Sequence, residues 1–135
     1  MKFRPASLAL LLVPSMLAAQ SPPAPEAGPG AAPLSLENRT ALRCAAAFAI
    51  IADGQARGNQ KSMAYPALGL RGREFFVRTS ARVMDDTGMD RTAVADVLRA
   101  QAQELQVDAE RGAKTEGGID QIMPACLLLL EASGV

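Results

Sequence analysis

Two cysteines, Cys44 and Cys126, most constrain what this chain can fold into, because they lie far apart and each falls in a helix-like apolar stretch. Around the first, Cys44, Phe48 and Ile51 recur at the i, i+4, i+7 spacing of an amphipathic helix. With no third thiol and no C-x-x-C spacing, a structural disulfide is favoured over a redox pair. Closing a loop of about 80 residues would stabilise the fold by ~4 kcal/mol. We therefore expect the first and last helices to be joined covalently.

Residues 1–19 have the features of a secretory signal peptide. Lys2 and Arg4 form a basic start, residues 6–17 are apolar, and small residues follow, so cleavage is expected after Ala19. A membrane anchor is the less favoured alternative, because Pro14 interrupts a run shorter than the ~18–20 residues that span a bilayer. No membrane span is then expected after cleavage. Export to the periplasm or the medium would also let the thiols oxidise.

The composition argues against several classes of function. The chain has no histidine, which is the commonest metal ligand and neutral-pH acid or base, and we expect neither a metal nor a cofactor. Cleavage would remove two of the 14 basic residues, Lys2 and Arg4, and none of the 14 acidic residues. The remaining chain would carry a net charge of 12 − 14 = −2. A mildly acidic domain is a poor binder of phosphate backbones, so nucleic acid is not an expected partner.

Helical patterns fill the part of the chain that follows residue 34. Residues 20–34 are rich in Pro, Ala and Gly and are expected to form a disordered linker, with a Pro-rich ligand as the alternative. Residues 35–135 are predicted to form one all-α domain of four helices, at about 35–57, 66–87, 90–110 and 124–133. Ser35 and Asp90 are the expected N-caps, Gly88 closes the second helix, and a glycine-rich break spans 112–118. The last helix is apolar nearly all round and is expected in the middle of the packing.

Two surfaces are candidates for binding. An apolar groove between the first two helices would be formed by Phe48, Met63, Tyr65, Phe75, Phe76 and Met84, unless these residues simply fill the core. A partner-binding face would be formed by Arg71, Arg73, Arg78 and Arg82, unless these arginines pair with acids on neighbouring helices.

No catalytic site is predicted. Asp86, Thr87 and Gly88 spell the D-T-G of aspartic proteases, but there the triplet follows a strand in a β-barrel, whereas here it ends a helical pattern. From Asp85 the acidic residues also fail the EF-hand spacing, and Asp90 is better explained as a helix cap.

The sequence therefore favours an exported, non-catalytic binding or interaction module of the bacterial cell envelope, with an unknown protein or apolar ligand as its partner. The alternatives are a small hydrolase that uses the carboxylates of Asp85, Asp86 or Asp90, or a secreted inhibitor or immunity-type protein that docks through the arginine face.

Overall fold

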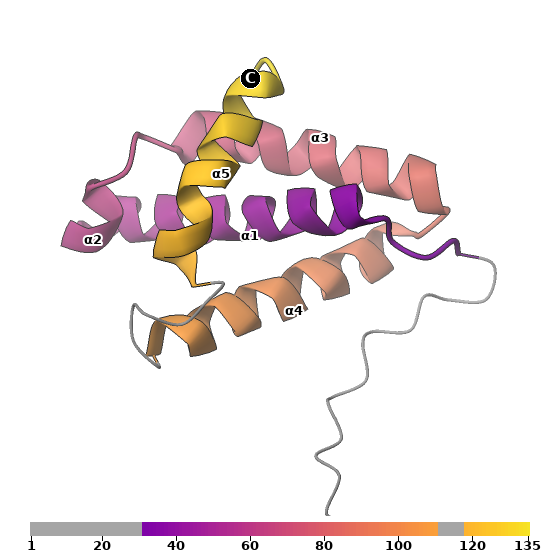
Figure 1. Ribbon diagram of the computed structural model, residues 1–135, viewed down its shortest axis with the longest axis horizontal. Coiled ribbons are helices and arrows are strands. Elements are labelled where there is room, and N and C mark those ends of the chain that lie inside the picture. Colours follow the sequence, from indigo (N-terminus) through magenta and orange to yellow (C-terminus); the bar gives the residue numbers. More distant parts are fainter. Residues whose placement is uncertain (1–30, 111–117) are drawn as a thin grey trace, which may run out of the picture.

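The computed structural model describes residues 31–110 and 118–135 and contains only helices in these ranges (Figure 1). The five helices are α1 (Leu36–Ala56), α2 (Gln60–Met63), α3 (Gly69–Thr87), α4 (Arg91–Glu110) and α5 (Ile119–Ala132). The prediction of an all-α domain is confirmed, with α2 as an additional short helix. The predicted signal peptide, most of the predicted linker and most of the glycine-rich break lie outside the described residues.

α1 is the central helix, and it packs against each of the other four (Figure 1). It begins as predicted, since the Ser35 hydroxyl accepts a hydrogen bond from the Asn38 N–H at 3.0 Å. All five residues from 44 to 48 are buried, which leaves this segment covered on every side. Three of the five are alanines, whose small side chains let several helices approach the same segment. The sequence pattern had indicated a buried stripe through Cys44, Phe48 and Ile51 and a second face of small residues that includes Ala45.

A tight turn follows α1 and contains the unpredicted α2. Asn59 caps α2 by accepting hydrogen bonds from two backbone N–H groups, at 3.0 and 3.2 Å. Gly54 allows the close contact, because a Cβ atom there would lie 2.1 Å from the Ser62 hydroxyl oxygen. The Gln55 side chain donates to one carbonyl of α2, that of Ser62, and to those of Tyr65 and Pro66 in the segment before α3. It accepts from the Leu68 N–H at 3.1 Å. One glutamine thus holds the α2–α3 connection against α1.

α3 begins at Gly69, three residues after the predicted start at Pro66. Gly72 lies where α3 meets α1, and a Cβ atom there would sit 3.2 Å from that of Phe48. The rings of Phe48 and Phe75 pack edge to face, with centroids 5.2 Å apart. The glycine that weakens helix propensity is therefore the residue that lets the two helices approach.

The α3–α4 junction follows the prediction. Gly88 adopts φ +73°, a left-handed conformation that favours glycine, and closes α3. Asp90 caps α4 by accepting a hydrogen bond from the Ala93 N–H at 2.8 Å. Ala32 donates to the Thr87 carbonyl at 2.8 Å, so the segment before α1 is attached to the end of α3.

α5 begins at Ile119, five residues before the predicted start, and includes Pro124. Pro124 removes one backbone donor, but Met123, Cys126 and Leu130 on the same helix are buried against the domain. The expectation that α5 lies in the middle of the packing is wrong. It crosses α1 on the outside of the domain (Figure 1). Leu128 of α5 is 73% exposed.

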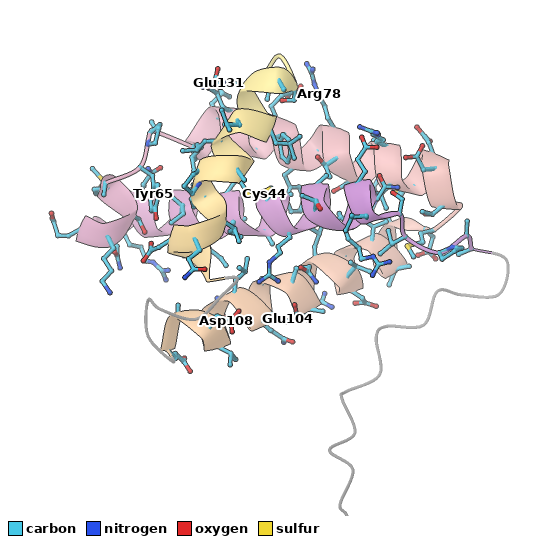
Figure 2. The ribbon with its side chains drawn as sticks, in the orientation of Figure 1. Cys44, Tyr65, Arg78, Glu104, Asp108 and Glu131 are labelled. Carbon is cyan, nitrogen blue, oxygen red and sulfur yellow. A yellow bond between two sulfur atoms is a disulfide. The ribbon has the colours of Figure 1, made fainter. Side chains whose placement is uncertain are left out.

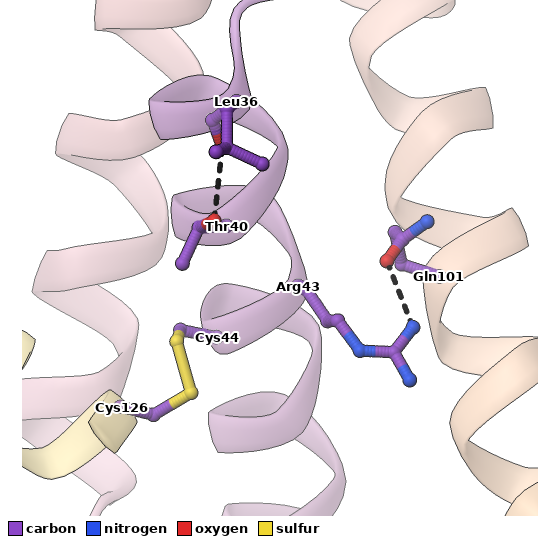
Figure 3. The surroundings of a disulfide bond; sticks show 6 residues. All are labelled: Leu36, Thr40, Arg43, Cys44, Gln101 and Cys126. Carbon is purple, nitrogen blue, oxygen red and sulfur yellow. Dashed lines mark hydrogen bonds between the residues drawn. A yellow bond between two sulfur atoms is a disulfide. The ribbon is translucent and has the colours of Figure 1, made fainter. Parts of the chain in front are cut away.

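The predicted disulfide is confirmed (Figure 3). Cys44 of α1 and Cys126 of α5 are joined across 82 residues of sequence, and both are buried. From the neighbouring position, Arg43 donates to Gln101 of α4 at 3.3 Å and forms an ion pair with Glu104 at 3.2 Å. α1 is therefore tied covalently to α5 and by a charged network to α4. Within the described ranges, no helix is both long and apolar enough to cross a membrane.

Candidate functional site

A groove of about 770 Å³ lies where α1, α3 and α5 meet and is referred to below as the α1/α3/α5 groove. It lies beside the place where α5 crosses α1 (Figure 1). Its lining comes from the first turns of α1, the middle of α3 and the end of α5. Its surface is mainly apolar, and Leu36 stands at its edge with 78% of its surface exposed. The lining residues are Leu36, Glu37, Asn38, Thr40, Ala41, Phe75, Arg78, Thr79, Arg82, Leu129, Ala132 and Ser133.

Charged side chains lie at the edge of this groove. Arg82 of α3 is 2.5 Å from Glu37 of α1 and 3.7 Å from Asp86. The hydrogen bond and the charge of Glu37 raise the pKa of Arg82. Arg78 extends beside the last turns of α5 and pairs with Glu74 at 2.8 Å (Figure 2). All of these groups are exposed to solvent, so the ion pairs between them are readily exchanged.

The base of the groove near Arg82 is held by a buried amide. Asn38 is 4% exposed, and its side-chain nitrogen donates to Asp86 at 3.2 Å. Asp86 thereby fixes the end of α3 against the start of α1. The D-T-G triplet has a structural role here, since the Thr87 hydroxyl donates to the Val83 carbonyl at 2.5 Å and Gly88 closes the helix.

The four predicted arginines do not form one continuous face. Arg78 and Arg82 line the groove. Arg71 instead pairs with Glu131 of α5 at 2.9 Å and donates to the Val135 carbonyl oxygen at 2.9 Å. This pairing lowers the pKa of Glu131. Arg73 is exposed and forms no ion pair within the described ranges.

The six residues predicted to form an apolar groove are not brought together. Phe48 and Phe75 are in the core, although Phe75 also reaches the α1/α3/α5 groove. Phe76 and Met84 line a smaller hollow of about 340 Å³ between α3 and α4. Met63 is 57% exposed on α2.

Tyr65, the last of the six, has a polar partner. Its hydroxyl donates to Asp120 at 2.6 Å, which joins the α2–α3 connection to the first turn of α5 (Figure 2). Burial, followed by the hydrogen bond and charge of Asp120, raises the pKa of Tyr65 to about 12. This contact secures the end of α5 that the disulfide does not reach.

The acidic residues singled out in the sequence are distributed around the α3–α4 junction. Asp85 is exposed, Asp86 binds Asn38, and Asp90 caps α4. Among the described residues, no three metal-ligating side chains lie close enough together to hold an ion. None of the three carboxylates lines either hollow.

Comparison with known proteins found no matching protein family, no matching characterised protein and no matching solved structure.

Sequence reasoning found one groove-lining aromatic, Phe75, and two groove-lining arginines, but it missed the other walls. The missed residues that define the walls are Leu36, Ala41, Thr79, Leu129 and Ala132. One local signal could have pointed to the groove: Leu36 follows the N-cap Ser35 directly, at a position that faces away from the buried stripe of α1. The contribution of α5 had no local signal, since it depends on the angle at which α5 crosses α1.

Proposed function

We propose that this protein is exported and acts as a non-catalytic binding module of the bacterial cell envelope, holding an apolar small molecule in the α1/α3/α5 groove. The single observation that carries the proposal is the groove itself. Its volume of about 770 Å³ falls within the range of small-ligand sites, and its apolar walls carry a few polar groups at the edge.

The walls of the groove are rigid enough to form a pre-shaped site. α1 is fixed to α5 by the disulfide and to α3 by the packing of Phe48 on Phe75. A ligand that enters a pre-formed hollow loses less free energy to ordering the protein than one that must organise a mobile surface. This favours binding through the groove.

Two observations favour a small ligand over the alternatives. Only two of the four arginines lie at the groove, which gives an acidic protein partner no continuous positive face. The hydrolase alternative needs carboxylates beside a substrate site, whereas Asp86 and Asp90 bind backbone or amide groups of the domain and stand outside the groove.

Export rests on the basic start and apolar run of residues 1–19 and is supported by the disulfide, which forms in oxidising compartments. It is tested by expressing the whole chain in a bacterial host and measuring the intact mass of the periplasmic product. A chain that begins at Gln20 supports export. Recovery of the uncleaved chain from the cytoplasm alone would refute it.

Binding is tested by titrating the protein with N-phenyl-1-naphthylamine, an uncharged apolar dye that fluoresces when it leaves water. Ala132→Trp places a bulky ring in the groove wall and is expected to weaken binding at least about ten-fold. Ala125→Trp is the matched control, because Ala125 is exposed on the same helix but does not line the groove.

A third variant, Ala95→Trp, fills the smaller α3/α4 hollow and identifies the site that the dye uses. Loss of binding in Ala132→Trp alone supports the proposal. An unchanged affinity in Ala132→Trp, or no dye binding by the wild type, would refute it.

A further inference from the structure

We infer that the ligand of the α1/α3/α5 groove is an uncharged apolar molecule that carries hydroxyl groups, and that Thr79 and Asn38 select it through hydrogen bonds. This inference rests on the proposed function and adds to it the chemical class of the ligand. It follows from two polar atoms of the groove lining that have no hydrogen-bond partner within the described residues.

The first of these atoms is the hydroxyl oxygen of Thr79 on α3. Thr79 lines the groove and is only 8% exposed. The hydroxyls of Thr40, Ser80 and Thr87 each donate to the backbone carbonyl four residues earlier in their own helix. The Thr79 hydroxyl makes no such bond to the Phe75 carbonyl, and it has no other hydrogen-bond partner within the described ranges.

The second atom is the side-chain oxygen of Asn38 on α1. Asn38 also lines the groove and is 4% exposed. Its side-chain nitrogen donates to Asp86, and because a carboxylate only accepts, this bond fixes which end of the amide faces Asp86. The oxygen at the other end is an acceptor, and in the part of the chain that the structure describes it receives no hydrogen bond.

Both atoms are open to the groove. Across residues 31–110 and 118–135, every side-chain nitrogen or oxygen that is closed off from solvent has a hydrogen-bond partner. The Thr79 hydroxyl and the Asn38 oxygen have none, so both reach solvent, and the groove is the hollow that both residues line. A ligand that covers these atoms without bonding to them would leave them buried and unpaired, which weakens binding.

The ligand groups that satisfy both atoms are hydroxyls. The Asn38 oxygen requires a donor, whereas the Thr79 hydroxyl can donate or accept. A ligand hydroxyl does both, so it is complementary to either residue. Thr79 is roughly 10 Å along the axis of α3 from Asp86, to which Asn38 is bonded. An elongated ligand with a hydroxyl near each end can therefore pair with both residues.

The charges beside the groove do not select an ion. Arg78 pairs with Glu74. Arg82 pairs with Glu37 and Asp86, so both of the arginines that line the groove already have carboxylate partners. The remaining walls are mainly apolar. The specificity of such a site comes from its few uncharged polar atoms.

The inference is tested by displacing N-phenyl-1-naphthylamine from the groove at neutral pH with two competitors of the same shape. The first, p,p′-dihydroxybiphenyl, carries a hydroxyl at each end and stays uncharged at this pH. The second, p,p′-dimethylbiphenyl, carries methyl groups in the same places. Because the diol has a hydroxyl at both ends, the result does not depend on which way round it lies. Inhibition constants are corrected for the affinity of each variant for the dye.

Thr79→Val assigns the hydrogen bond, because valine has the shape of threonine and lacks the hydroxyl. The variant is expected to bind the diol about three- to ten-fold more weakly than the wild type does. It should bind the dimethyl compound at least as tightly, since that compound has no hydroxyl to lose a partner.

Thr40→Val is the matched control. It makes the same change in the same groove, but the Thr40 side chain is exposed and its hydroxyl already donates to the Leu36 carbonyl at 2.9 Å. This variant should keep its affinity for both competitors within about two-fold of the wild type.

The melting temperature separates this role of Thr79 from a structural one. A hydroxyl that has no partner in the protein adds nothing to its stability, so Thr79→Val should melt no lower than the wild type. A fall of more than about 4 °C would show that the hydroxyl helps to hold the fold and would overturn the inference.

A loss of diol affinity in Thr79→Val alone, with binding of the dimethyl compound retained, supports the inference. No displacement of the dye by the diol, an unchanged affinity for the diol in Thr79→Val, an equal loss for both competitors, or an equal loss in Thr40→Val would overturn it. The proposed function would stand in those cases if Ala132→Trp still blocks the dye. Failure of Ala132→Trp to affect the dye would instead refute both.

Discussion

Removing the disulfide should destabilise the domain by an amount set by the length of the loop that it closes. Cys44 and Cys126 are separated by 82 residues, and the loss of chain entropy on cross-linking such a loop corresponds to about 4–5 kcal/mol at room temperature. For a domain of this size, 1 kcal/mol shifts the melting temperature by about 4–8 °C. The Cys44→Ala, Cys126→Ala double variant is therefore expected to melt about 16–40 °C below the wild type.

The assay is urea unfolding followed by far-ultraviolet circular dichroism, with the oxidised wild type, the reduced wild type and the double variant compared. The dependence of the unfolding free energy on urea should rise when the bond is absent, because the unfolded chain becomes less compact and exposes more surface. The reduced wild type serves as a control for the substitutions, since it lacks the bond but keeps both sulfur atoms.

A loss below about 1 kcal/mol in both bond-free forms would refute this reasoning. It would mean that the bond hardly restricts the unfolded chain, because that chain is already compact. In the folded protein, α5 has other contacts as well: Met123 and Leu130 are fully buried, and Arg71 pairs with Glu131. Burial of two such side chains is worth about 3–6 kcal/mol, so α5 is expected to stay docked in the reduced protein at room temperature.

Two further predictions concern the polar contacts around α2. The pKa of Tyr65 is raised to about 12, so the neutral phenol is favoured in the folded state. Its contribution to the free energy of unfolding is therefore fully present below pH 10 and is lost as the pH rises from 10 to 12. Because Tyr65 is the only tyrosine and tryptophan is absent, its near-ultraviolet absorbance titration reports this pKa directly, and Asp120→Asn should lower it. Gln55→Ala should cost about 1–3 kcal/mol in urea unfolding, because four hydrogen bonds to α2 and the α2–α3 connection are lost and Leu68 N–H is left buried; an unchanged midpoint would contradict this role.

The features that the sequence predicted well depend on local chemistry. Ser35, Gly88 and Asp90 each act on backbone groups within four residues, and each ends or begins a helix as expected. The disulfide is long-range, but with only two cysteines in the chain there was a single pairing to consider.

The features that it missed depend on contacts between distant segments. α2 is too short to show a periodic pattern, and it forms because Gly54 leaves room for Ser62 and Gln55 binds the segment that follows. Pro124 indicated a helix start, but the burial of Met123 outweighs the one backbone hydrogen bond that proline removes. Rules that consider only neighbouring residues in the sequence cannot compare the free energy gained by such tertiary contacts with the free energy lost when a backbone hydrogen bond is removed.

The candidate site was the least predictable feature. Phe48, Phe76 and Met84 share apolar character, yet Phe48 packs in the core against Phe75, whereas Phe76 and Met84 line the hollow between α3 and α4. The α1/α3/α5 groove arises where α5 stops covering the other two helices, and that place is fixed by the position of Cys126 along α5 together with the crossing angle. Residue spacing along a single helix contains no information about that angle.

The covalent link between α1 and α5 also determines how the protein would respond to proteases outside the cell. Every connection between Cys44 and Cys126 lies inside one closed ring of the chain. A single cut in any of those turns would open the ring without releasing a fragment, and the helices on both sides of the nick would remain joined. Only a second cut within the ring could detach a piece, so the nicked protein would keep its parts together long enough for the helices to repack.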